Sequence, residues 1–151
     1  MKRIPVNECK VRFPALSRNE GLSRSAAAAF AMQCDPTVEE ISAIKTAVSE
    51  AVTNAIVHGY RDMNGEVELL MRLYSDNAVY IQVKDKGRGI PDVRQAMQPT
   101  YTTAPADEER SGLGFTVMES FMDKVRVRSV DGRGTVVTME KKIAGKRNDE
   151  R

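Results

Sequence analysis

The chain is poor in the side chains that build metal centres and disulfide frameworks. Its 151 residues include only two cysteines and one histidine. Cys9 and Cys34 have neither a CxxC spacing nor a neighbouring histidine, which favours two reduced, partly buried thiols. Because His58 is the only histidine, a histidine-rich metal site is excluded.

Long apolar runs and an excess of one charge sign are also missing. No segment approaches the roughly 20 apolar residues of a membrane span, and residues 1–5 lack the apolar core of a signal peptide. The net charge of +2, with both signs interspersed, provides no basic face for nucleic acid. The composition, 41% hydrophobic and 29% charged, predicts a globular protein with one core. The missing span, signal peptide and basic face predict a cytoplasmic location with no membrane or direct nucleic-acid partner.

The hydrophobic pattern separates helices from hairpins. A helical period runs from a capping box, Ser17 with Glu20, to Met32, and a second runs from about residue 37 to His58 with Asp35 as its cap. Two-residue alternation interrupted by turn signals predicts strands. These strands cover residues 9–13, 66–74, 78–84, 125–130 and 135–139, and shorter helices cover 93–97 and 114–122.

This order of elements predicts an α+β fold. We expect a two-layer sandwich with a mostly antiparallel sheet and helices on one face. Residues 91–109 contain three prolines and no clear apolar period, which predicts a long functional loop or lid. One domain would span residues 1–143, and residues 144–151 would form a charged, frayed tail.

A carboxylate and a carboxamide, Glu50 and Asn54, lie one turn apart on the second predicted helix. Their spacing places both off its apolar stripe, beside a row of small residues (Ala43, Ala47 and Ala51) that would leave room for a ligand. The Asn54 oxygen suits Mg²⁺, and Glu50 is placed to deprotonate an attacking hydroxyl or water. Taken alone, the pair also fits two solvated positions on an amphipathic helix.

Two glycine-rich clusters follow. Asp85 ends a predicted strand, and Gly87 and Gly89 after it permit positive φ and close backbone approach, while an ionised Asp85 can accept a bond from an exocyclic amino group such as that of adenine. The segment Arg110-Ser111-Gly112-Leu113-Gly114 opens a predicted helix, whose free N–H groups suit an anion. The three clusters together supply the chemistry needed to hold Mg-ATP and act on it.

The clusters resemble the signature boxes of the GHKL ATPase superfamily. Residues 49–56 with His58-Gly59 look like its N-box, residues 85–89 its first glycine box, residues 111–114 its second, and Gly134-Thr135 its closing strand element. Within the superfamily the chain resembles the anti-sigma serine kinases nearly end to end, including residues 13–20 and 109–112. The resemblance implies a Bergerat ATP-binding fold with an ATP lid.

The resemblance also implies roles for individual residues. Glu50 would be the catalytic base, Asn54 the Mg²⁺ ligand, and Asp85 the acceptor for the adenine amino group, with Thr135 nearby. The remaining positions expected to contact ATP or ADP are glycine-box and lid residues: Gly87, Gly89, Thr102, Thr103, Arg110, Ser111, Gly112, Leu113 and Gly114.

Protein partners are implied in the same way. Arg24 and Arg110 match arginines on the partner face of the family. The resemblance implies a homodimer that holds a sporulation sigma factor, sigma F, inactive and phosphorylates a serine of an anti-anti-sigma factor. The sequence departs from the family pattern after the lid threonines, where Ala104-Pro105 replaces Lys-Pro and the segment to Arg110 is one residue longer.

Four alternatives share the same boxes. A sigma B antagonist uses the same motifs. A histidine-kinase catalytic domain would need a partner carrying the acceptor histidine, since His58 lies in the N-box. A fragment of a gyrase or chaperone ATPase would require a transducer domain. A nucleotide-gated binding module without catalysis would have no use for Glu50 as a base.

Overall fold

The computed structural model describes residues 3–60, 64–98 and 114–146. Five strands form one sheet in the order β1-β2-β3-β5-β4, every neighbouring pair antiparallel: β1 Asn7–Pro14, β2 Glu66–Leu73, β3 Ala78–Asp85, β4 Lys124–Val130 and β5 Gly134–Lys142. The helical segments are α1 Asn19–Ala31, η1 Met32–Cys34, α2 Val38–Asn54, η2 Ala55–Gly59, α3 Val93–Ala96 and α4 Gly114–Phe121.

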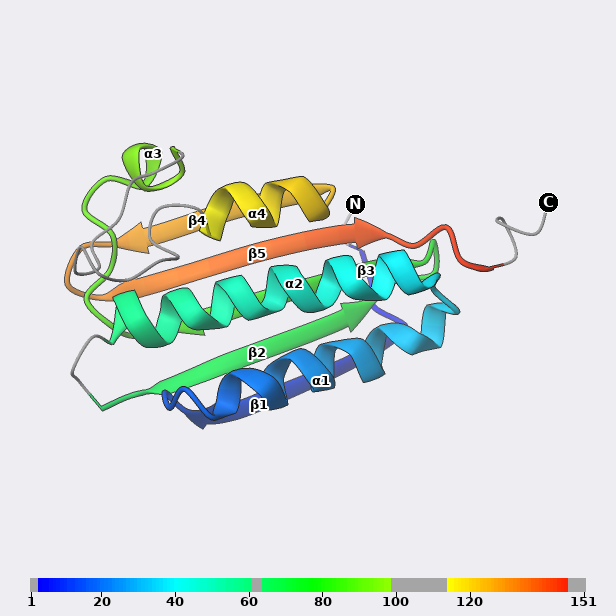
Figure 1. The fold of residues 1–151 in the computed structure, drawn as a ribbon, viewed down its shortest axis with the longest axis horizontal. Helices are drawn as coiled ribbons and strands as arrows, with labels where there is room; N and C mark the ends of the chain where they lie inside the picture. The colour runs from blue at the N-terminus through cyan, green and yellow to red at the C-terminus, as the bar shows by residue number, and fades with distance from the viewer. Residues whose placement is uncertain (1–2, 61–63, 99–113, 147–151) are drawn as a thin grey trace.

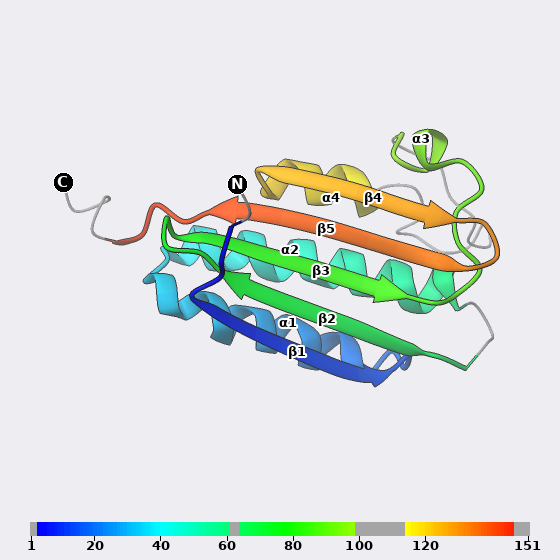
Figure 2. The same cartoon turned by 180° about the vertical axis from the view of Figure 1, so that it is seen from behind.

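The helices and the sheet form two layers. Figures 1 and 2 show α1, α2 and α4 side by side on one face of the sheet, with α2 in the middle. This arrangement confirms the predicted α+β sandwich with helices on one face. Among the described residues, no helix combines the length and apolarity required to cross a bilayer.

Alternation within the strands builds the core between the layers. Alternate residues of β2 and β3 face the helices and are buried, as is the apolar stripe of α2: Val67, Leu69, Met71, Val79, Ile81, Val83, Ile44, Val48 and Val52. The small residues beside this stripe behave differently from the prediction. Ala43 and Ala47 are buried in packed surroundings, and only Ala51 of the three lines the pocket described below.

The helix starts correct two expectations. Thr37, not Asp35, caps α2: its hydroxyl accepts from the Glu40 N–H at 3.1 Å, and the Glu40 carboxylate accepts from the Thr37 N–H at 2.9 Å. Asp35 instead adopts a left-handed φ of 51° between η1 and α2. The Ser17 capping box is also wrong, because α1 begins after Arg18 without a side-chain cap and the Glu20 carboxylate accepts from the Ser49 hydroxyl on α2.

The chain after β5 is tied to the start of α2. The Glu40 carboxylate accepts from the N–H groups of Ala144 at 2.7 Å and Gly145 at 3.1 Å. Burial opposes ionisation of Glu40, but these bonds and those from Thr37 outweigh it and lower its pKa. The region expected to fray from residue 144 therefore holds contacts at its first residues.

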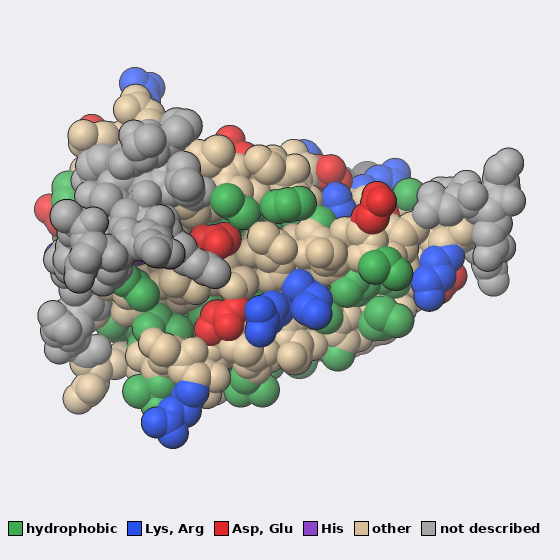
Figure 3. All heavy atoms as spheres, viewed as in Figure 1, with side chains coloured by type: hydrophobic (Ala, Val, Ile, Leu, Met, Phe, Trp, Pro, Cys, Tyr) green, Lys and Arg blue, Asp and Glu red, His purple; other side chains and the backbone are tan. Residues whose placement is uncertain are grey.

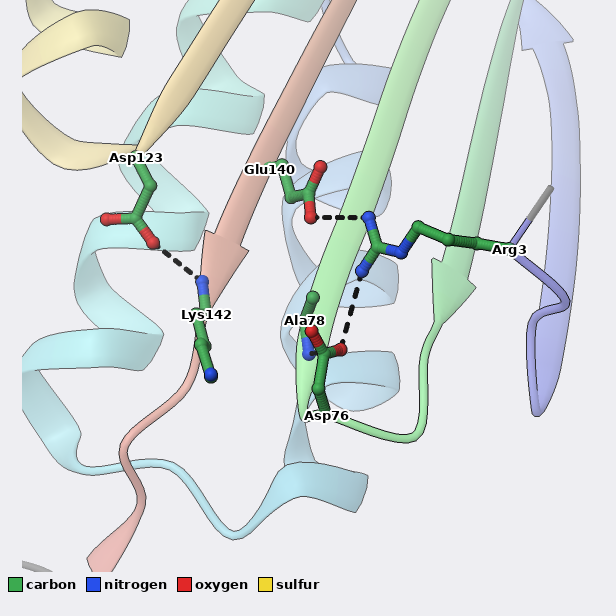
Figure 4. A network of polar contacts seen from close by, with 6 residues as sticks. All are labelled: Arg3, Asp76, Ala78, Asp123, Glu140 and Lys142. Atoms are coloured by element: carbon green, nitrogen blue, oxygen red, sulfur yellow. Dashed lines mark hydrogen bonds and ion pairs between the residues drawn. The ribbon is translucent and has the colours of Figure 1, made fainter. Parts of the chain in front are cut away.

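The N-terminal segment crosses the helix-free face of the sheet (Figure 2). Arg3 donates to Glu140 on β5 at 2.8 Å and to Asp76 in the β2–β3 turn at 3.4 Å (Figure 4). Its guanidinium also lies 3.9 Å from the centre of the Tyr74 ring. The same view shows Asp123 accepting from the Lys142 N–H at 2.7 Å. These contacts fasten strand ends that lie away from the pocket.

Candidate functional site

One pocket lies where α2 ends above the end of β3 and the start of β5. Five of the predicted ATP-contacting residues line it although they come from separate segments: Asn54, Asp85, Gly89, Gly114 and Thr135. Its other lining side chains include an apolar set that suits the face of a flat ring: Ala51, Ala55, Val83, Ile90, Ala96, Phe115 and Val137. His58, Gly59 and Arg88 complete the lining.

Asp85 is the buried acid of this pocket. Its side chain is at the end of β3 with 6% of the residue exposed. Burial raises the pKa of Asp85 to about 6, and hydrogen bonds from the backbone N–H groups of Gly87 and Thr135 oppose that rise. A carboxylate kept in such a place, and turned toward a pocket, is a candidate ligand contact.

Two glycines make room for the loop of residues 85–90, here called the glycine loop. A Cβ on Gly59 would lie 2.8 Å from an Asp85 carboxyl oxygen, and a Cβ on Gly87 would lie 1.9 Å from the Gly59 carbonyl oxygen. Neither glycine has positive φ. The His58-Gly59 pair looks in sequence like an ordinary helix end, but Gly59 ends the π-helical turn η2 and is required by this close contact.

Four N–H groups of the glycine loop donate hydrogen bonds to acceptors within the protein. Lys86 N–H donates to the Tyr60 hydroxyl at 2.8 Å and Gly87 N–H to the Asp85 carboxylate at 2.9 Å. Arg88 N–H donates to the Gly59 carbonyl at 2.8 Å, and Ile90 N–H donates to the Ser129 hydroxyl at 2.6 Å. Gly89, with φ of 74°, lies against the Val130 carbonyl, which a Cβ would approach to 2.2 Å.

Replacing Gly87 by alanine should destabilise the protein. The new methyl group must displace the Gly59 backbone, and overpacking of this kind costs about 1–3 kcal/mol or more. We expect a lower Tm and weaker nucleotide binding, measured by thermal unfolding with and without ADP.

Gly21→Ala is the matched control. Gly21 lies on α1, where a Cβ would meet nothing closer than 3.8 Å, so alanine should stabilise the helix by about 1 kcal/mol. Equal melting temperatures for Gly87→Ala and the wild type would contradict the close contact between Gly87 and the Gly59 backbone.

Asn54 faces the start of α4. A Cβ on Gly114 would lie 2.9 Å from the Asn54 amide nitrogen and 3.1 Å from its oxygen, so this glycine lets the amide approach the helix start. An amide oxygen in a pocket is a suitable single protein ligand for Mg²⁺, which takes its other ligands from water and phosphate. The Asn54 position therefore fits the expected metal.

Glu50 lies one turn before Asn54 but opens onto a different surface. It lines a groove between α1 and α2 together with Arg24, Lys45 and Ser49. Figure 3 shows charged side chains of both signs gathered over these two helices. Arg24 also lies 3.8 Å from the Glu20 carboxylate. The predicted base and the predicted partner-binding arginine thus share one groove.

Several predicted positions lie outside the described residues, namely Thr102, Thr103, Arg110, Ser111, Gly112 and Leu113. Gly87 is described but supports the loop without lining the pocket. No role was predicted from the sequence for Ala96, Phe115 or Ser129. Ser129 belongs to no sequence motif. Only its hydrogen bond with Ile90 N–H in the structure shows that it contacts the glycine loop.

The two cysteines differ in burial. Cys34 is buried, and burial raises the pKa of its thiol. Cys9 on β1 is exposed, which differs from the partly buried state expected. Both are free thiols, as predicted.

The sequence matches known proteins over most of its length. A family model described as the histidine kinase-like ATPase domain matches residues 13–141. The anti-sigma F factor of Geobacillus kaustophilus is 51% identical over 139 residues, which cover 91% of this chain and 94% of that protein. The anti-sigma F factor of Pasteuria penetrans is 50% identical over 149 residues, covering 98% and 97%.

Solved structures share the fold at low sequence identity. The RsbU and RsbW domains of Rv1364c from Mycobacterium tuberculosis match with a TM-score of 0.66 and 21% identity, over 92% of this chain and 32% of that one. The mycobacterial sensor histidine kinase MprB matches with a TM-score of 0.56 and 14% identity, over 89% and 97%. These likenesses establish the fold.

Proposed function

The chain belongs to the histidine kinase-like ATPase family and, within it, to the anti-sigma F factors, and from this membership we propose its function. It binds and inhibits a sporulation sigma factor, sigma F. As a serine protein kinase, it also phosphorylates an anti-anti-sigma factor with Mg-ATP. The observation that supports this most directly is the meeting of Asn54, Asp85, Gly114 and Thr135 around one pocket.

The residues of the pocket and Glu50 in the α1–α2 groove divide the work of phosphoryl transfer. Asp85 accepts the adenine amino group beside Thr135, and the apolar lining holds the ring. Asn54 would hold Mg²⁺, which when bound would neutralise charge on the phosphates. Glu50 takes the proton of the attacking serine hydroxyl. Transfer of this kind relies on positioning and charge neutralisation more than on covalent chemistry.

The shared groove supports the partner assignment. Arg24 lies in the same groove as Glu50, so a protein bound through Arg24 would have its surface beside the catalytic base. We assign Arg24 to the partner face on this ground and retain Arg110 from the family likeness. A homodimer and a cytoplasmic location belong to the same proposal, and light scattering would measure the dimer mass.

Purified partners test the function. The protein is mixed with sigma F of a spore-forming relative and with ADP or ATP, and complex formation is followed by size-exclusion chromatography. We expect a complex whose stability depends on the nucleotide. With the anti-anti-sigma factor and labelled ATP, we expect a phosphoprotein. Absence of a sigma F complex with both nucleotides would overturn the proposal, and a complex with sigma B alone would favour that alternative.

A histidine-kinase activity is the second candidate. The family model that matches residues 13–141 is described as a histidine kinase-like ATPase domain, and such a kinase would need a partner that carries the acceptor histidine. Acid treatment of the phosphorylated partner separates the two, since phosphoserine persists in acid and phosphohistidine is lost. We expect the label to persist.

Asn54→Ala tests the metal ligand. Without the amide oxygen, Mg²⁺ loses its protein contact, so the gain in ATP affinity produced by Mg²⁺ should disappear. Isothermal titration with and without Mg²⁺ measures this gain. Gln82→Ala, which removes an amide from β3 outside the pocket, is the control and should behave as wild type. An undiminished effect of Mg²⁺ in Asn54→Ala would contradict the assignment.

A further inference from the structure

Ser129 lies behind the pocket wall, on β4. It is not among the lining residues, but it pairs across the β4–β5 ladder with Thr135, which lines the pocket and is 7% exposed. Its hydroxyl makes three contacts: it accepts from Ile90 N–H at 2.6 Å, reaches the Gly134 carbonyl at 3.0 Å, and lies 2.9 Å from the Thr135 hydroxyl. One side chain thus joins the glycine loop to the start of β5.

The three contacts determine which hydroxyl donates. A serine hydroxyl has one proton, and a carbonyl oxygen can only accept, so the bond to Gly134 uses the Ser129 proton. Thr135 must then donate its own proton to Ser129. Its oxygen has only lone pairs left for the pocket.

An acceptor at Thr135 has a consequence for the bound base. Ionised Asp85 also only accepts hydrogen bonds, and it lies opposite Thr135 in the β3–β5 register. The Asp85 and Thr135 side chains therefore offer acceptors alone. They suit the exocyclic 6-amino group of adenine, which donates, and disfavour the 6-carbonyl that replaces it in hypoxanthine, which can only accept.

We propose that Ser129 is a positioning residue that sets adenine specificity by holding the Thr135 hydroxyl as an acceptor. This rests on the proposed function, in which Asp85 and Thr135 read the base. Without the Ser129 oxygen, Thr135 can rotate and donate its proton into the pocket. The wall then tolerates a carbonyl on the base.

Ser129→Thr and Ser129→Val form a matched pair. Both side chains are β-branched and suit a strand, and they differ by the hydroxyl alone. The measured quantity is the ratio of the dissociation constants for IDP and ADP, by isothermal titration. Thr should keep the wild-type ratio. Val should weaken ADP binding about tenfold and lower the ratio by a similar factor, as expected for loss of a buried hydrogen-bonded group.

A double-mutant cycle with Thr135→Val separates positioning from simple loop support. If Ser129 acts through the Thr135 hydroxyl, Ser129→Val should change the ratio little once Thr135→Val is present. Equal weakening of IDP and ADP, with an unchanged ratio, would reduce Ser129 to loop support and overturn its role in specificity. A wild-type protein that binds neither diphosphate would overturn the proposed function along with it.

Discussion

Replacing Glu50 by alanine should leave ADP affinity near the wild-type value and slow phosphoryl transfer by roughly 10²- to 10⁴-fold. The carboxylate lines the α1–α2 groove and not the pocket around Asp85, so its loss would remove the proposed base without disturbing a bound nucleotide. Single-turnover transfer of labelled phosphate to the anti-anti-sigma factor measures the rate, and titration with ADP measures the affinity.

Glu39→Gln is the control for this change. Glu39 lies exposed in the first turn of the same helix and lines neither the pocket nor the groove, so its substitution should alter neither quantity. A wild-type transfer rate in Glu50→Ala would remove Glu50 from the mechanism. A parallel loss of ADP affinity would indicate a disturbed pocket instead.

Asp85→Asn should weaken ADP binding and stabilise the ligand-free protein at the same time. In the proposed function the adenine amino group would donate to a charged Asp85 and would meet a neutral amide in the variant, and losing a hydrogen bond to a charged group costs about 10- to 100-fold in affinity. The ligand-free protein gains because it no longer buries a carboxylate. A shift of the Asp85 pKa from 3.8 to about 6 corresponds to about 3 kcal/mol at pH 8.

The sign of the pH dependence follows from the raised pKa of Asp85. Between pH about 4 and 6 the folded protein binds the Asp85 proton more tightly than the unfolded chain does. Its contribution to stability is thus fully present at low pH and is lost as the pH rises through about 6. The stability difference between Asp85→Asn and wild type should be largest above pH 6 and vanish near pH 4.

Urea unfolding across this pH range measures the difference. Asp35→Asn, at an exposed position, is the control and should stay within about 0.5 kcal/mol of wild type at every pH. The same ionisation should make wild-type ADP affinity fall as the pH drops below about 6. A pH-independent stability difference for Asp85→Asn would contradict a buried, ionising Asp85.

The fold was predictable because its elements carry strong local patterns. The helix predicted for 114–122 and the short one predicted for 93–97 end within one residue of α4 and α3. Strand edges were less accurate. β5 runs on to Lys142, although the prediction stopped at residue 139, because cross-strand pairing with β3 continues after the apolar alternation fades.

The features that could not be predicted from the sequence depend on tertiary contacts. Glu20 matches a capping box, but its carboxylate binds Ser49 across the helix pair, an interaction that local spacing cannot reveal. The π-helical turn at the end of α2 brings Gly59 against the Asp85 side chain, a contact that local spacing cannot reveal either. The clusters predicted which residues meet, whereas the reason for each glycine came from the backbone or side chain that it lies against.

The glycine loop also limits how the protein can hold a triphosphate. Such loops are often pictured as cradles whose amides grip an anion. Here the N–H groups of Lys86, Gly87, Arg88 and Ile90 all point to protein acceptors. These four donors cannot be offered to a ligand unless a protein bond breaks. Among the described residues, we therefore expect the loop to shape the nucleoside end of the pocket and the negative charge of a nucleotide to lie toward the α2–α4 end, near Asn54 and Gly114.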